Sequence, residues 1–323
     1  MRVALDVMGT DRGPGEIVAG AVMAAEAGFE VVLVGDENDI RPMLRQTGAD
    51  LDIVHAPDVI EMHEDPTRAL RKKPDSSVVT AARLVRSGEA EAMVSAGSTG
   101  AAMAAATILI GRISGVLRPA IATIIPTSDH PVTLIDAGAN TDVRPQHLAQ
   151  FAVMGSLVAE IICGIESPRI GLLNIGKERA KGRELERSAY GLLEAAAVNF
   201  VGNVEGSDIV GDVADVFVTD GFTGNVALKT LEGTAIFAVA MVQAALARLP
   251  LHELPGVEGA VADVEETLNS EQYGGAHLVG TRGGVVIGHG SSSRVAIFNA
   301  VRLATGGVKG GLVERLEQEF GSS

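Results

Sequence analysis

The sequence of 323 residues contains no tryptophan and a single cysteine, Cys163. One cysteine excludes an internal disulfide framework and any zinc or iron–sulfur site built on several cysteines. Aromatic residues amount to eight Phe and two Tyr, and 41 acidic against 26 basic residues give a formal net charge of −15. Non-specific nucleic-acid binding needs a basic footprint, and single-strand binding usually needs aromatic stacking platforms. We therefore expect no nucleic-acid partner.

Long apolar runs are also scarce. The first residues, MRVALDVMGTD, place Asp6 and Asp11 where a signal peptide would need an apolar run. The longest apolar stretch, Gly233 to Ala247, spans about 15 residues, fewer than the ~18–20 that a membrane-spanning helix needs. We expect a cytoplasmic protein, with peripheral contact at the membrane left open.

Short apolar runs alternate with Ala/Leu-rich amphipathic segments along the chain. Runs such as VVLV, IATII and VVIG are continuous, which is typical of parallel strands buried on both faces. The expected strands are Arg2–Val7, Glu30–Val34, Asp52–His55, Ala92–Ser95, Ala120–Ile125, Thr133–Asp136, Arg169–Asn174, Val213–Thr219 and Val285–His289. The expected helices include Gly15–Ala27, Ser76–Ser87, Thr99–Gly111, Pro145–Gly164, Arg183–Ala197 and Gly224–Leu249. This alternation predicts an α/β fold, a doubly wound and mostly parallel sheet in an α/β/α sandwich.

A single domain over residues 1–323 accounts for this pattern, with one departure after Leu249. Turn signals at Pro250, Pro255 and Gly256 precede a short acidic helix. We expect residues 233–272 to form a helical hairpin that protrudes from the domain.

Six expected strands run directly into a glycine-bearing loop: DVMGTDRG, VSAGSTGA, IDAGANTD, LNIGKERAKG, VTDGFTGN and IGHGSSSR. Two of these loops are alike, Gly97-Ser98-Thr99-Gly100 and Gly221-Phe222-Thr223-Gly224. Loops at the carboxyl ends of strands can place backbone N–H groups around an anion. A single such loop is ordinarily just a tight turn, but six together favour an anionic substrate.

Several familiar motifs are absent or incomplete. The segment from Gly171 to Lys177 approaches a P-loop, but Glu178 stands where a hydroxyl is needed and would repel phosphate. No G-x-G-x-x-G follows the first strand, no G-x-S-x-G is present, and no metal-ligand spacing such as H-E-x-x-H occurs. We therefore expect neither a metal nor a cofactor, and a structural role for Cys163.

Polar residues at strand ends are the candidate catalytic groups. Asp220, Asp136 and His289 each close an expected strand immediately before a glycine loop. Lys181 lies in the loop after Asn174. A carboxylate at a strand end is often only a helix N-cap, and for Asp136 that alternative is strong.

Basic residues form two clusters within this acidic chain. The first comprises Arg68, Arg71, Lys72 and Lys73, and the second comprises Lys177, Arg179, Lys181, Arg183 and Arg187. Each is explained equally by a solvated helix face, but such patches can also steer an acidic partner.

The combination of segments resembles the bacterial phosphate acyltransferases, which convert acyl-carrier-protein thioesters and inorganic phosphate into acyl phosphate for phospholipid synthesis. The matching segments run from Val3 to Ala300 and include DVMGTDRGP, VSAGSTGAAMAAA, DAGANTD, GLLNIGKERAKGRELERSAY, DVFVTDGFTGNVALKTLEG, YGGAHLVG and GHGSSSRVAIFNA. The resemblance implies an isocitrate/isopropylmalate-dehydrogenase-like fold, a homodimer, and acyl carrier protein and phosphate as partners. It also suggests a membrane glycerol-3-phosphate acyltransferase as the consumer of the product.

On this reading a phosphate oxygen attacks the thioester carbonyl, and the pantetheine thiolate leaves. The catalytic candidates are Asp220, Lys181, His289 and Asn225, with Asp220 taking a proton or orienting a neighbour. Asn225, His289 and the N–H of Gly221 are candidate donors to the carbonyl oxygen. The substrate- and phosphate-binding candidates are Gly97, Ser98, Thr99, Gly100, Asp136, Asn140, Asn174, Gly221, Thr223, Ser291 and Ser292.

Two alternatives stay open. One is a short-chain phosphate acetyl- or butyryltransferase that uses coenzyme A, and the other is a non-catalytic acyl-binding or membrane-scaffold protein. Residues Leu249 to Ser270 hold five acids and no Lys or Arg, so we do not expect attachment to an anionic membrane through charge.

Overall fold

The computed structural model describes residues 1–127, 129–246 and 269–321, together with residues 256, 259, 261, 262 and 264. Its strands are β1 (Arg2–Asp6), β2 (Glu30–Gly35), β3 (Asp52–His55), β4 (Ala92–Ser95), β5 (Ala120–Ile125), β6 (Val132–Ile135), β7 (Arg169–Asn174), β8 (Asn199–Glu205), β9 (Val216–Val218), β10 (Ala276–Val279) and β11 (Gly284–Ile287). Its helices are α1 (Pro14–Glu26), α2 (Glu37–Thr47), α3 (Pro66–Lys72), α4 (Ser77–Ser87), α5 (Thr99–Ala105), α6 (Pro145–Cys163), α7 (Glu184–Ala195), α8 (Gly221–Leu246), α10 (Arg294–Lys309) and α11 (Leu312–Phe320). Short helical turns are η1 (Ala106–Ile110), η2 (Gly206–Val210) and η4 (Ser270–Gln272).

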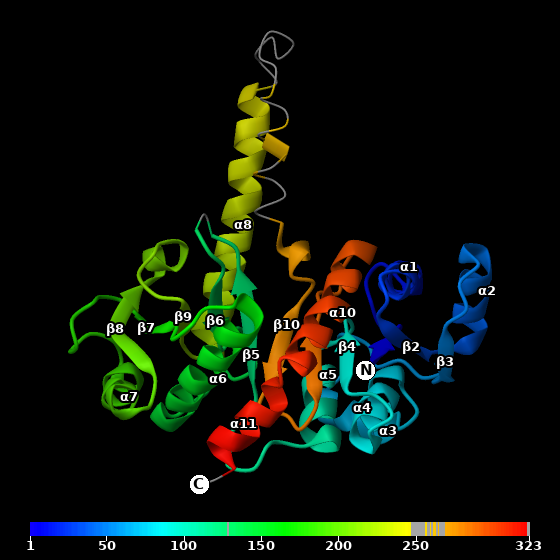
Figure 1. Cartoon of the computed structure of the whole chain (residues 1–323), viewed down its shortest axis with the longest axis horizontal. Helices are drawn as coiled ribbons and strands as arrows, with labels where there is room; N and C mark the ends of the chain where they lie inside the picture. Colours follow the sequence, from blue (N-terminus) through cyan, green and yellow to red (C-terminus); the bar gives the residue numbers. More distant parts are fainter. Residues whose placement is uncertain are drawn as a thin grey trace.

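The strands form one sheet in the order β3-β2-β1-β4-β11-β10-β5-β6-β9-β7-β8 (Figure 1). Most neighbouring pairs are parallel, which confirms the predicted mostly parallel sheet. Strand β10 is antiparallel to both of its neighbours, β11 and β5, and β5 is antiparallel to β6. Strands β6, β9, β7 and β8 therefore run opposite to β1–β4, β5 and β11.

This reversal divides the six glycine loops between the two edges of the sheet. The loops after β1, β4 and β11 lie at one edge, called the Gly97 edge here. Those after β6, β7 and β9 lie at the other, called the Asp220 edge. The six loops therefore follow strands that point in two opposite directions, and which of these loops bind phosphate stays a prediction.

Helices cover both faces of the sheet, as successive side chains of β5 illustrate. Ile121 packs with α3, α4 and α5, whereas Ala120 and Ala122 pack on the opposite face with α6 and α11. Further along β5, Ile125 lies in the cluster against which the first turns of α8 pack. The first face thus carries α3, α4, α5 and the start of α8, and the second carries α1, α2, α6, α7, α10 and α11.

Helix α8 leaves the body of the molecule after its first turns (Figure 1). Two helices in the described part of the chain are long and apolar enough to cross a membrane, namely α6, with half of its apolar window buried, and α8, with none of it buried. The estimate of 15 apolar residues was too short, because α8 starts at Gly221. Most of the second arm of the expected hairpin over 233–272 lies outside the described residues, so the hairpin stays a prediction.

Candidate functional site

Asp136 organises the loop that follows β6. Its side chain is fully buried and accepts hydrogen bonds from the backbone N–H groups of Ile121 (3.1 Å), Gly138 (3.1 Å), Ala139 (2.9 Å) and Asn140 (2.7 Å). The amide Nδ2 of Asn140 donates a fifth, at 2.8 Å. Burial raises the pKa of Asp136 and these hydrogen bonds oppose that rise. Asp136 is not a helix N-cap, because the next helix, α6, begins at Pro145 and has Arg144 at its N-cap.

The N-terminus of α8 packs directly on that loop. Gly221 N donates to Asn140 O at 2.7 Å, so this N–H is already used and the expectation that it serves the substrate carbonyl is wrong. A Cβ at Gly221 would meet the Asn140 backbone at 2.7 Å, and one at Gly224 would meet Asp136 O at 2.0 Å. Close approach therefore requires both glycines. A Cβ at Gly138 would lie 3.7 Å from that of Asn225, which places Asn225 beside the same loop.

Asp220 lies between α8 and the loop after β7. Its carboxylate is buried and accepts hydrogen bonds from Arg183 Nη2 at 2.5 Å and from Thr223 N and Oγ1, each at 2.9 Å. Burial alone would raise the pKa of Asp220, but the hydrogen bonds from Thr223 and Arg183 outweigh it and lower this pKa. An ionised carboxylate held in this way suits orientation of a neighbour better than proton abstraction.

The cation on Asp220 is thus Arg183, which sequence reasoning left in a basic cluster without a specific role. Lys181 is half-exposed, and its Nζ lies 3.9 Å from Glu178 Oε2. Asn174 Nδ2 donates to Lys181 O at 3.2 Å, and Asn174 Oδ1 accepts from Ile175 N at 2.8 Å. Asn174 therefore shapes the loop that carries Lys181 and Arg183.

A cavity of about 470 Å³ opens at the Asp220 edge, on the α5 face of the sheet. It is called the anion cavity here, and it is lined by Met103, Thr107, Arg112, Leu117, Arg118, Pro119, Asn140 and Leu278. Arg112 Nη1 donates to the carbonyl groups of Val116 and Leu117. Arg118 is exposed, and its side chain has no hydrogen-bond or ion-pair partner among the described residues. Two guanidinium groups without a lining carboxylate favour an anionic ligand.

Sequence reasoning missed both of these arginines. They lie in the connection between η1 and β5, which has no helix N-terminus and no glycine loop of the kind used to choose candidates. The cavity becomes visible only when Asn140, on the loop after β6, is brought against Pro119, whose O accepts from Asn140 Nδ2 at 2.8 Å.

The remaining candidates lie at the Gly97 edge. Ser98 caps α5 through Ala101 N (3.4 Å), and Thr99 and Gly100 are the first residues of that helix. A Cβ at Gly97 would lie 3.2 Å from Met8 O, so the loops after β1 and β4 are in close contact.

His289 and its serines form a local network at this same edge. The ring Nδ1 lies 2.7 Å from Ser291 Oγ, and His289 N donates to Ser292 Oγ at 3.1 Å. His289 and Ser291 are exposed, whereas Ser292 is buried. Asp220 and Asn225 follow β9, so the predicted set is divided between the two edges. Within the described residues, no group of three or more His, Cys, Asp or Glu is arranged to hold a metal ion.

Comparison with known proteins shows which family the chain belongs to. Residues 1–315 match the family model described as "Fatty acid synthesis protein". A phosphate acyltransferase of Desulfitobacterium hafniense (strain Y51) is 47% identical over 326 residues, covering 99% of this chain and 97% of the relative. One of Heliobacterium modesticaldum is 48% identical over 327 residues, covering 99% and 98%.

Solved structures share the fold at low identity. A phosphotransacetylase from Streptococcus pyogenes has a TM-score of 0.64 at 18% identity and covers 95% of this chain and 94% of its own. A 4-hydroxythreonine-4-phosphate dehydrogenase from Klebsiella pneumoniae has a TM-score of 0.54 at 13% identity, covering 94% and 98%. These matches confirm the predicted fold class. The chain belongs to the phosphate acyltransferase family of fatty acid synthesis proteins.

Proposed function

We propose that this phosphate acyltransferase takes a long-chain acyl group from acyl carrier protein, and that inorganic phosphate binds in the anion cavity. The observation that carries the proposal is the pair Arg112 and Arg118 beside Asn140. A guanidinium fork matches the geometry of phosphate oxygens and forms charge-assisted hydrogen bonds with them.

The reaction needs little more than positioning. A phosphate oxygen forms a bond to the thioester carbonyl carbon, the C–S bond breaks, and the thiol of the carrier leaves as thiolate. Phosphate is largely dianionic near neutral pH, so orientation and exclusion of water contribute more than a strong base. Asn225 is the candidate donor to the carbonyl oxygen at the Asp220 edge, because it lies beside Gly138 of the loop that forms the cavity wall.

The two basic clusters favour a protein carrier over free coenzyme A. In the second cluster each cation has an acidic partner within 4.0 Å, from Lys177–Asp208 to Arg187–Glu184. Lys73, which directly follows α3, is paired with Glu64. On α3 itself, Arg68, Arg71 and Lys72 are exposed and have no acidic partner among the described residues. In a chain of net charge −15, this free basic face of α3 supports docking of an acidic protein.

The position of α3 strengthens this argument. A Cβ at Gly100 of α5 would lie 2.7 Å from Pro66 Cγ of α3, so the two helices are in direct contact. Met103, on α5, lines the anion cavity. A carrier bound on the free face of α3 is therefore adjacent to the helix that leads to the proposed phosphate site.

The test is phosphate-dependent release of thiol from palmitoyl acyl carrier protein, palmitoyl-coenzyme A and acetyl-coenzyme A under matched conditions. We expect kcat/KM to be highest for the carrier-protein thioester and lowest for acetyl-coenzyme A. A preference for acetyl-coenzyme A would replace the proposal with a short-chain enzyme. Thiol release that does not depend on phosphate would overturn the assignment of phosphate as the acceptor.

We further propose a cytoplasmic homodimer that contacts the membrane at most peripherally and supplies acyl phosphate to a membrane glycerol-3-phosphate acyltransferase. The exposed apolar side chains of α8, among them Ile236, Phe237 and Met241, support burial of this helix against another surface. Analytical ultracentrifugation of the full chain tests the dimer, and a monomer at micromolar concentration would contradict it.

A further inference from the structure

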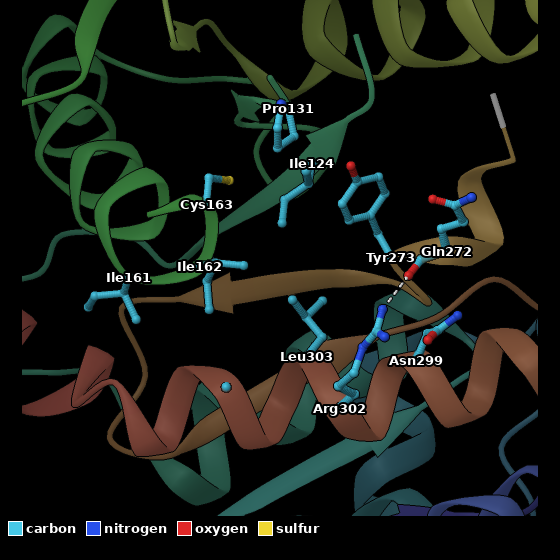
Figure 2. A pocket seen from close by; sticks show the side chains of 11 residues that line it. Ile124, Pro131, Ile161, Ile162, Cys163, Gln272, Tyr273, Asn299, Arg302 and Leu303 are labelled. Carbon is cyan, nitrogen blue, oxygen red and sulfur yellow. Dashed lines mark hydrogen bonds between the residues drawn. The ribbon is translucent and has the colours of Figure 1, made fainter. Parts of the chain in front are cut away.

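A second cavity, of about 270 Å³, lies on the opposite face of the sheet from the anion cavity (Figure 2). It is called the Arg302 cavity here. Its walls come from the end of β5, the last turn of α6, the residues after η4 and one side of α10. The apolar part of the lining is formed by Ile124, Pro131, Ile161, Ile162 and Leu303. The function proposed above makes no use of it.

The polar side chains of Gln272, Asn299 and Arg302 lie on one side of the cavity, whereas the Tyr273 hydroxyl points away from Arg302 toward Ile124 (Figure 2). Figure 2 shows Arg302 beside Tyr273, with the guanidinium bonded to the backbone of Gln272. Arg302 Nη2 donates to Gln272 O at 3.2 Å, which holds the guanidinium toward the cavity. Among the described residues, no Asp or Glu lines this cavity.

We propose that the Arg302 cavity binds an unbranched acyl chain that ends in an anionic head group, a carboxylate or a phosphate. The chain lies along Ile124, Ile162 and Leu303, and the head group accepts hydrogen bonds from Arg302. An apolar wall with one cation and, among the described residues, no acid is complementary to an amphipathic anion. The proposal goes beyond the proposed function, since this site is separated by the sheet from the anion cavity.

The volume sets the length of the chain. A cavity of ~150 Å³ holds benzene, with six carbon atoms, so 270 Å³ fits a chain of about ten carbons. The test is therefore isothermal titration calorimetry with decanoate and decyl phosphate, and with decanol as the uncharged chain. We expect both anions to bind at one site and decanol to bind at least tenfold more weakly, because a hydrogen bond to a charged group is lost. Affinity should rise about fourfold per methylene from hexanoate to decanoate.

The chain offers two matched variants. Gly306 lines the cavity from α10, and a Cβ there would have only Ile162 Cδ1, at 3.9 Å, within 4 Å. Gly306→Leu therefore fills the cavity and also improves helix propensity, so we expect at least a tenfold loss of decanoate affinity with no loss of thermal stability. Arg302→Gln should weaken both anions at least tenfold but leave decanol unchanged. The control is Lys309→Gln, two turns along the same helix and outside the cavity lining.

The outcomes separate this proposal from the proposed function. Binding is measured without phosphate or thioester. The proposal for the Arg302 cavity therefore holds even if the preferred carrier is not acyl carrier protein. Decanoate affinity unchanged in Gly306→Leu and in Arg302→Gln would locate the acid elsewhere and overturn the proposal. Equal affinity for decanol and decanoate would overturn the role of Arg302, and no binding of either anion would overturn the site. We expect Gly306→Leu to keep its phosphate-dependent thiol release.

Discussion

Asp136 is the residue on which the Asp220 edge depends most directly. Five N–H donors converge on its two oxygens, and the group is fully buried. Asp136→Asn replaces one acceptor oxygen by a donor amide that faces other donors. We expect it to lower the free energy of unfolding by about 3–5 kcal/mol, measured by urea denaturation. Asp142→Asn, at an exposed position nearby, is the control and should change it by less than about 0.5 kcal/mol.

Arg118 is the residue that most directly tests the anion cavity. If its guanidinium binds phosphate, Arg118→Gln removes a charge-assisted hydrogen bond and should raise the KM for phosphate about 10- to 100-fold. The KM for acyl carrier thioester should change much less. Arg86→Gln, which removes an exposed arginine of α4 that has no ion-pair partner among the described residues, serves as the control. An unchanged phosphate KM in Arg118→Gln would place phosphate elsewhere.

The pair Asp220–Arg183 predicts non-additive effects on catalysis. Each partner positions the other through a 2.5 Å contact, so removing either one disrupts the same unit. We expect Asp220→Asn and Arg183→Gln each to lower phosphate-dependent thiol release at least tenfold, and the double variant to be no worse than the more severe single. Lys181→Ala, which lacks such a contact, should have the smaller effect. Independent, multiplying effects in the double variant would contradict coupling.

At the scale of elements, α3 predicts how the enzyme chooses its carrier. Reversing the free face with Arg68→Glu, Arg71→Glu and Lys72→Glu together should raise the KM for palmitoyl acyl carrier protein about tenfold at low salt, with a smaller effect at high salt. The KM for palmitoyl-coenzyme A should stay within about twofold. Steady-state kinetics with both thioesters at two ionic strengths checks this expectation.

A matched control keeps the same change in net charge. Arg45→Glu, Arg86→Glu and Lys309→Glu reverse three exposed cations on α2, α4 and α10 that have no acidic partner among the described residues. This variant should retain the KM of the unmodified enzyme for the carrier-protein thioester. If both triple variants raise the KM for the carrier-protein thioester equally, the total charge is responsible and not docking on α3.

The strands also show where the local sequence pattern does not predict the structure. Strands such as β2 and β5 were predictable, because their apolar runs are continuous and buried on both faces. Strand β8 was missed, since as an edge strand it exposes Asn199 and Val201 and contains Gly202. Strand β10 is only four residues long, and glycines flank it. It lies antiparallel between β11 and β5, and the antiparallel pairing of β5 with β6 reverses the strands that follow. Nothing within four residues encodes such long-range pairing.

The site was predictable to the same degree. Asp136, Asp220 and their glycines were recognisable because each follows a buried strand, which is a local signal. Arg112, Arg118 and Arg183 were not, because their roles depend on contacts with residues distant in sequence. Arg183 contacts Asp220, 37 positions away. The structure thus supplies the partners of the candidate residues, whereas the sequence identifies their types.

At the scale of the whole molecule, an acidic chain depends on how its carboxylates are paired. Asp215 is the best example, because it joins three parts of the sheet. Its side chain accepts from Arg169 N (2.7 Å) at the start of β7, and it lies 2.8 Å from His130 Nε2 in the β5–β6 turn. Its backbone bonds to Arg169 and Thr133 continue the ladder. Burial alone would raise the pKa of Asp215, but the bonds from Arg169 and His130 outweigh it and lower this pKa to about 2.

This shift predicts how the stability of the fold depends on pH. A carboxylate whose pKa falls from 3.8 to about 2 on folding stabilises the native state above pH ~4, and that contribution disappears as the pH falls toward 2. At ~1.4 kcal/mol per unit, it amounts to about 2 kcal/mol at pH 7. Asp215→Asn should therefore unfold more easily than the unmodified protein at pH 7, and the difference should shrink between pH 4 and pH 2.

Urea denaturation at pH 7, 5, 4 and 3 measures that difference directly. Asp212→Asn is the matched control, because Asp212 pairs with the same arginine but its side chain is 65% exposed. Solvent screens that exposed pair, so we expect less than about 1 kcal/mol from it. A destabilisation by Asp215→Asn that stays constant from pH 7 to pH 3 would mean that shape and hydrogen bonding, and not the charge of Asp215, connect the three strands.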